Sequence, residues 1–83
     1  MDFYVGQIVR AKAGRDKGGF FIVTQLDGSY AYIANGKKRK VESPKKKKLI
    51  HLVPTSAVIQ DVGRTNREFR RILSDYCDKS LSL

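Results

Sequence analysis

Short runs of β-branched and aromatic residues, each ended by glycine or proline, constrain the fold of this 83-residue chain more than any other feature. Residues 20–26 (FFIVTQL) and 30–34 (YAYIA) have compositions that favour extended backbone. Across residues 5–13 (VGQIVRAKA), one parity is mostly apolar and the other carries charge, as in a half-buried strand. With further segments at 37–41 and 49–53, five short strands predict a mostly β fold, a small five-stranded barrel.

Glycine and proline also predict where these strands turn. Asn35-Gly36 is the strongest hairpin signal, because a two-residue type I′ turn needs positive φ at both positions. This turn is expected to join residues 30–34 to a strand at 37–41. Pro44 is then expected to end that strand, and Pro54 to end the fifth.

The last quarter of the chain changes its periodicity and predicts a helix over residues 66–78. Thr65-x-x-Glu68 is a capping-box pattern, and an apolar stripe follows at Phe69, Ile72, Leu73 and Tyr76. The stripe is expected to pack on an open end of the barrel, with a partner-binding face as the alternative. A chain this short supports one core. We therefore expect a barrel over residues 1–62, with a helix and tail over residues 63–83 that pack on it. Arg67, Arg70 and Arg71 either extend the basic surface or are merely solvated.

Positive charge is concentrated in one segment. The chain has 17 Lys and Arg against 8 Asp and Glu, a net charge of +9. Residues 37–48 alone hold eight basic residues and one acid, Glu42, which gives 8 − 1 = +7. The repulsion between so many like charges is offset when a polyanion lies across them, and a phosphate backbone is the expected partner. A solvated loop that aids solubility and a nuclear localisation signal at 37–40 are the alternatives.

Several classes of protein are disfavoured by what the sequence lacks. Cys77 and His51 are single residues, too few for a disulfide framework or a structural zinc site, and they suit a reducing cytosol. We expect His51 to be a packed, hydrogen-bonded residue. No signal peptide, membrane segment or nucleophile–base pair is evident. A phosphate-binding loop is not evident either, since Phe20 stands where such a loop has lysine. We therefore expect a cytoplasmic protein without membrane partner, cofactor or enzymatic activity.

The run from Ile8 to Gly18 (IVRAKAGRDKG), followed by residues 20–23, resembles the KOW motif, whose invariant glycine falls on Gly18. Residues 34–40 (ANGKKRK) and His51-Leu52 extend this likeness. Together they are similar to the KOW-domain large-subunit ribosomal proteins of eukaryotes and archaea, and to short bacterial KOW-domain RNA-binding proteins. The resemblance covers about residues 5–53 and implies an SH3-like (KOW) barrel that binds RNA, ribosomal RNA above all, in or on the ribosome. NusG-type transcription elongation factors share the KOW motif, so a protein-interaction module of the elongation machinery is the alternative function.

These observations assign expected roles to individual residues. Gly14 and Gly18 form a loop that lets backbone approach a sugar–phosphate chain, while Asp16 orders the loop by accepting bonds from backbone N–H groups. Tyr30 and Tyr32 both offer a ring for base stacking, and Tyr32 is the one that we assign to this role. A position in the barrel core is the alternative for both. The expected phosphate contacts are Arg15, Lys17, Lys37, Lys38, Arg39, Lys40, Lys45, Lys46, Lys47 and Lys48. Partners are RNA and ribosomal proteins, and the free chain is expected to be a monomer. An exposed apolar patch would instead favour protein docking.

Overall fold

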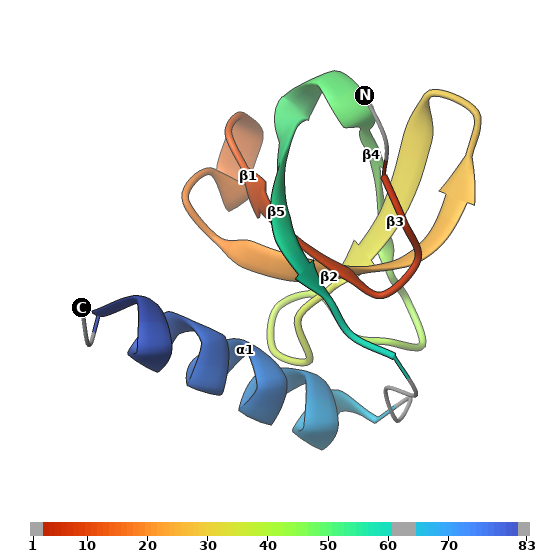
Figure 1. The fold of residues 1–83 in the computed structure, drawn as a ribbon. Helices are drawn as coiled ribbons and strands as arrows, with labels where there is room; N and C mark the ends of the chain where they lie inside the picture. Colours follow the sequence, from red (N-terminus) through yellow and green to blue (C-terminus); the bar gives the residue numbers. More distant parts are fainter. Residues whose placement is uncertain (1–2, 61–64, 82–83) are drawn as a thin grey trace.

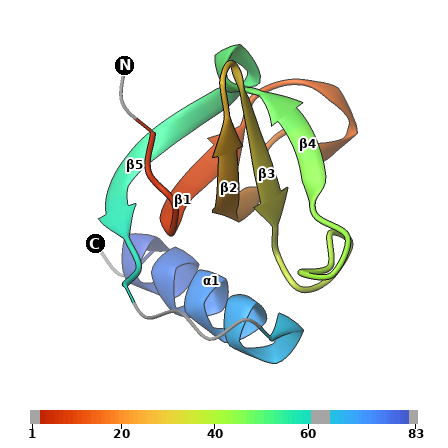
Figure 2. The same ribbon diagram turned by 90° about the vertical axis from the view of Figure 1, so that its right-hand side faces the viewer.

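The computed structural model describes residues 3–60 and 65–81, and this part of the chain is a five-stranded antiparallel sheet with one C-terminal helix (Figure 1). The sheet order is β4-β3-β2-β1-β5, so β4 and β5 are its edges, and they diverge from the short turn that joins them in Figure 2. The elements are β1 (Gln7–Ala11), β2 (Phe20–Asp27), β3 (Tyr30–Ala34), β4 (Lys45–Lys48), β5 (Leu52–Val58) and α1 (Asn66–Leu81), with short 3-10 turns at Gly14–Asp16 and Leu49–His51. No helix in these residues is long and apolar enough to span a membrane.

Buried side chains form two clusters, because both faces of the central strands are covered. The first cluster contains Val9, Ala11, Phe21, Val23, Ala31, Ile33 and Leu52, which alternate along the strands with residues of the second cluster. The second is a row across the sheet, in which Ile8 pairs with Ile22 and Ile22 with Ala34, covered by Phe69 and Leu73 of α1. The outer face of β1 is therefore not uniformly charged, since Ile8 is buried under the helix while Arg10 stays exposed.

The helix prediction is confirmed, and the N-cap bond of the capping-box pattern is formed. The backbone N–H of Glu68 donates to Thr65 Oγ1 at 3.1 Å, and the Thr65 hydroxyl donates to Glu68 Oε1 at 2.9 Å. Phe69 and Leu73 are buried, which stabilises the docked helix by about 1.5–3 kcal/mol for each side chain. The helix continues to Leu81, three residues beyond the predicted end at 78.

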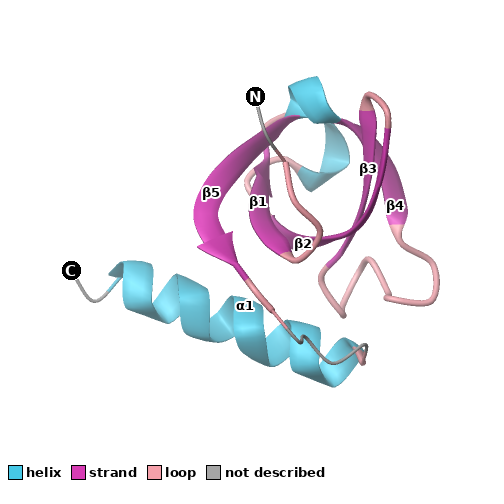
Figure 3. Ribbon diagram, turned by 45° about the vertical axis from the view of Figure 1, so that its right-hand side comes forward, coloured by secondary structure: helices cyan, strands magenta, loops and turns pink. Residues whose placement is uncertain are grey.

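The Asn35-Gly36 hairpin prediction is wrong. Residues 35–44 form a loop, the basic loop, seen in pink between β3 and β4 in Figure 3. The strand β4 is the second basic cluster, residues 45–48, and not the first, residues 37–40. Asn35 Oδ1 accepts the backbone N–H groups of Lys37 (2.9 Å) and Arg39 (3.0 Å), which curls the chain away from β3. Gly36 has φ +79°, and a Cβ there would collide with the backbone carbonyl of Asn66. The glycine thus permits the loop to approach the start of α1.

The fifth strand begins and ends later than predicted. Leu49–His51 is a 3-10 turn, and Pro54 lies inside β5, opposite Val9 of β1. Proline has no backbone N–H to donate, but an edge strand needs hydrogen bonds on one side only. The position of β5 at the edge of the sheet therefore tolerates a residue that would end a central strand.

Candidate nucleic-acid interface

Two tyrosines and two lysines share one face of the β3–β4 pair. Tyr32 is paired with Lys46 and Tyr30 with Lys48, and the residue between the tyrosines, Ala31, is fully buried on the opposite face. The ammonium group of Lys46 lies 4.6 Å from the ring centroid of Tyr30 and 5.9 Å from that of Tyr32. Both rings lie outside the two buried clusters, which favours the stacking role over the core role. We call these four residues the tyrosine–lysine face.

A hollow of about 360 Å³ adjoins the tyrosine–lysine face. Its lining residues are Ser29, Tyr30, Lys48 and Ile50, the last with 71% of its surface exposed. An apolar side chain beside an aromatic ring and a lysine suits a base with its phosphate, because bases are flat and apolar on their faces. This edge of the sheet therefore offers contacts for bases as well as for phosphates.

Asp16 is the buried centre of the basic region. Its carboxylate side chain is 2% exposed, and it accepts hydrogen bonds from Arg39 Nε (3.3 Å) and Arg39 Nη2 (3.0 Å). The ammonium groups of Lys47 and Lys38 lie 3.7 and 3.8 Å from its oxygens. The prediction that Asp16 accepts hydrogen bonds from backbone N–H groups is thus wrong. Its partners are cationic side chains, because they compensate the buried charge more strongly than amides would.

These cations also set the titration of Asp16. Burial alone would raise the pKa of the carboxyl, but the hydrogen bond from Arg39 and the charges of Arg39, Lys47 and Lys38 outweigh it. The pKa of Asp16 therefore lies below its ordinary value of 3.8. The group is ionised at neutral pH and ties the glycine loop to both basic clusters.

The pairing with Asp16 divides the eight basic residues into two kinds. Arg39 and Lys47 have side chains only 24% and 10% exposed, and Lys47 Nζ also donates to the carbonyl of Ala13 at 2.9 Å. Both are committed to holding the fold. The other six are exposed, and they are Lys37, Lys38, Lys40, Lys45, Lys46 and Lys48. All eight were predicted as phosphate contacts, and the structure brings only these six to the surface as candidates.

The glycine loop meets the basic loop through Asp16. Gly14 and Gly18 have φ +77° and +88°, values that favour glycine. Arg15 of the 3-10 turn and Lys17, which follows this turn, are exposed at the surface. A Cβ added to Gly18 would meet no atom within 4 Å, so the backbone there faces open space. The backbone at Gly18 is therefore accessible, and contact between this loop and a ligand stays a prediction.

The start of α1 holds the other side of the basic loop, a role that no pattern in the sequence indicates. Asn66 Oδ1 accepts the backbone N–H of Val41, and Asn66 Nδ2 donates to Glu42 Oε1, both at 2.8 Å. The bond from Asn66 lowers the pKa of Glu42. Arg70 Nη1 donates to the carbonyl of Gly36 at 2.7 Å, so this arginine partly supports the loop.

Among the residues described, no three His, Cys, Asp or Glu side chains come together to hold a metal ion. No protein-family model matches the chain, and a search of curated proteins found no match. The geometry of the site is consequently the basis for any functional assignment.

Proposed function

We propose that this chain is a non-catalytic RNA-binding module, built as an SH3-like (KOW) barrel. The observation that carries the proposal is the tyrosine–lysine face, where two aromatic rings lie beside the ammonium group of Lys46 on one sheet edge. Stacking on aromatic side chains combined with a cationic path for the backbone is how proteins hold unpaired nucleic acid. The KOW resemblance supports the barrel and the RNA ligand independently of this face.

Phosphate contacts supply affinity in this proposal, while the aromatic rings favour unpaired bases. Lysine presents a point charge without the planar fork that arginine offers to guanine, so the six exposed lysines position RNA without reading its sequence. Arg39 is bound to Asp16, which leaves Arg15 as the exposed arginine of the glycine loop. Sequence preference is therefore expected to be weak.

Ribosomal RNA is the proposed target. The test is fluorescence anisotropy with a ribosomal RNA fragment and co-sedimentation with ribosomal subunits, both across a salt series. If the six exposed lysines each neutralise one phosphate, the log–log slope is about −4 to −5. A slope flatter than about −1 contradicts the proposal, because the basic region would then not be the binding surface.

A second candidate function is protein docking of the kind found in transcription elongation factors. It is favoured by an apolar hollow of about 340 Å³ lined by Phe3, Lys12, Leu49, Ile50 and Leu52. Phe3→Ser tests it in the same co-sedimentation experiment, because Phe3 lines this hollow and not the one beside the tyrosine–lysine face. Protein docking is favoured if this variant loses binding to the subunits while Lys46→Gln/Lys48→Gln retains it, and RNA binding is favoured by the reverse.

A further inference from the structure

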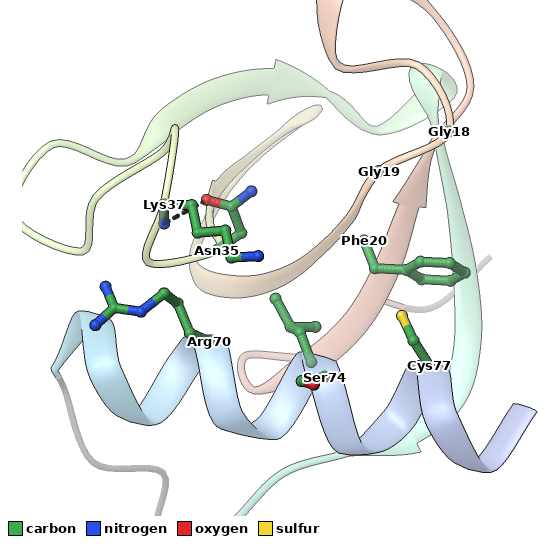
Figure 4. Close-up of a pocket in the computed structure, with 9 residues that line it drawn as sticks. Gly18, Gly19, Phe20, Asn35, Lys37, Arg70, Ser74 and Cys77 are labelled. Atoms are coloured by element: carbon green, nitrogen blue, oxygen red, sulfur yellow. Dashed lines mark hydrogen bonds between the residues drawn. The ribbon is translucent and has the colours of Figure 1, made fainter.

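A groove of about 380 Å³ runs between the glycine loop, the start of the basic loop and α1 (Figure 4). Gly18, Gly19 and Phe20 border it on the sheet side, and Leu73, Ser74 and Cys77 of α1 border it on the helix side. Asn35, Lys37 and Arg70 line its remaining wall. Neither the sequence motifs nor the tyrosine–lysine face account for this groove.

The lining combines an apolar floor with cationic and amide groups. Phe20 and Leu73 both pack in the second buried cluster and present apolar surface at the base of the groove. Lys37 is exposed, and Arg70 donates one nitrogen to Gly36, which leaves further N–H groups of its five. None of the described residues that line the groove is acidic. It therefore suits an anionic ligand that has a flat apolar part.

Asn35 adds a donor for the edge of such a ligand. Its carbonyl oxygen accepts two backbone N–H groups of the basic loop, so its orientation is fixed. Its amide nitrogen has no hydrogen-bond partner among the residues that the structure describes. An oriented amide donor beside an apolar floor is the kind of group that recognises a base edge.

We infer that this groove binds one unpaired nucleotide of the RNA, with its base on Phe20 and Leu73 and its phosphate at Lys37 and Arg70. The inference rests on the proposed RNA-binding function and deepens it. Lys37 begins the basic loop and Lys17 directly precedes Gly18, so the groove is continuous with the cationic surface on both sides. A paired base is enclosed in its duplex, so the groove selects single-stranded segments.

Cys77 makes the groove directly observable, because it is the only cysteine in the chain and it lines the groove. Its reaction rate with a thiol reagent is measured in the free protein, with a 12-nucleotide oligouridylate, and with a duplex RNA of equal phosphate number. Both RNAs are added to saturation as judged by anisotropy. With oligouridylate, we expect Cys77 to react only in the fraction of protein that has no RNA bound, so the measured rate falls accordingly. With the duplex, we expect the rate to stay near that of the protein without RNA.

Ser74→Tyr tests the groove by filling it, and Ser56→Tyr is the matched control at an exposed serine of β5. Because the tyrosine ring takes the place of the stacked base, the first variant should bind oligouridylate about tenfold more weakly. The control should bind like the parent chain, and duplex binding should be unchanged in both. Cys77 protection in the parent chain decides the question even if Ser74→Tyr fails to fold.

The outcomes separate this inference from the proposed function. Oligouridylate that binds without protecting Cys77 overturns the groove and leaves RNA binding intact. Protection by an oligoglutamate peptide equal to that by oligouridylate also overturns the nucleotide assignment, because any anion would then enter. Failure of both RNAs to bind overturns the proposed function and the inference together.

Discussion

The two basic clusters have nearly the same composition but occupy different structures. Residues 37–40 lie in a loop that is curled by Asn35 and held against α1, and Lys45–Lys48 form the edge strand β4. In the loop, Arg39 turns inward to Asp16. In the strand, alternation sends Lys47 inward to the same carboxylate and leaves its neighbours exposed.

This difference shows that charge density does not determine which charges are available. Each cluster gives one mostly buried cation to Asp16 and keeps three exposed, although the exposed Lys38 of the loop also lies 3.8 Å from the carboxylate. Only the strand places its exposed lysines beside aromatic rings, because pairing with β3 fixes Lys46 and Lys48 next to Tyr32 and Tyr30. The loop cluster is expected to contribute affinity alone, and the strand cluster affinity together with base contact.

Removing Asp16 should have the largest effect, since it leaves two mostly buried cations unpaired. Asp16→Ala is expected to lower the free energy of unfolding by about 2–4 kcal/mol, somewhat less than for a fully buried pair because Arg39 is partly exposed. Urea denaturation measures the loss. The control is Asp27→Ala, whose carboxylate is 60% exposed and 3.8 Å from Lys46, with an expected change below about 0.5 kcal/mol. Equal effects would show that Asp16 does not link the clusters.

The same carboxylate predicts acid sensitivity of at most that size. Because the folded-state pKa of Asp16 is lowered from 3.8, the unfolded chain takes up its proton first as pH falls. The stabilisation is complete above the unfolded pKa and is lost as pH falls through the folded pKa. Melting temperatures measured between about pH 6 and pH 2 should fall more steeply for the parent chain than for Asp16→Asn. Parallel curves would refute the linkage, since Glu42 titrates in both proteins.

Gly36→Ala should perturb the loop cluster specifically. The substitution meets both the positive φ and the close approach to the Asn66 carbonyl, so we expect a loss of about 2–3 kcal/mol. Gly28→Ala is the control, because its φ is +57° but its surroundings are open. That variant should lose only about 1–2 kcal/mol in denaturant titration. If the two losses are equal, the contact between the loop and α1 contributes nothing to stability.

Local patterns predicted much of the fold. The strand at 30–34 coincides with β3, β2 extends only one residue beyond its predicted end, and the helix starts where the capping box indicates. The fourth strand was misplaced because Asn-Gly is a signal for a turn, and here side-chain bonds of Asn35 make a different one. The fifth strand was predicted to end at Pro54 for a similar reason, since a strand tolerates proline only where it lies at the edge of the sheet, as β5 does.

The candidate site was predicted in composition but not in detail. Counting charge located the basic segment, yet Arg39 lies 23 residues from Asp16 and Lys47 lies 34 from Ala13. Pairings at such separations follow from the sheet register and the loop path, which no local pattern encodes. The groove beside α1 was missed for the same reason, because its lining comes from three distant segments.

Tyr32→Ala should separate the strand cluster from the loop cluster in RNA binding. Losing one stacked base is expected to weaken binding to single-stranded RNA by about 1–3 kcal/mol and to change duplex binding little. Tyr4→Ala is the control, because Tyr4 is 53% exposed but does not belong to the tyrosine–lysine face. Anisotropy titrations with both RNAs measure the difference. An equal loss for both RNAs would assign Tyr32 to packing instead of stacking.

The smallest expected effect distinguishes two adjacent lysines of β4. Lys48 is exposed on the tyrosine–lysine face, so Lys48→Gln should flatten the log–log salt slope of RNA binding by about 0.7–0.9 without changing stability. Lys47 is bonded to Ala13 and paired with Asp16, so Lys47→Gln should lower stability and leave the slope unchanged. Measuring both quantities for both variants gives a crossed result that neither general destabilisation nor general loss of charge produces. If the two variants flatten the slope equally, Lys47 reaches phosphate as well, and the division between fold-holding and exposed cations fails.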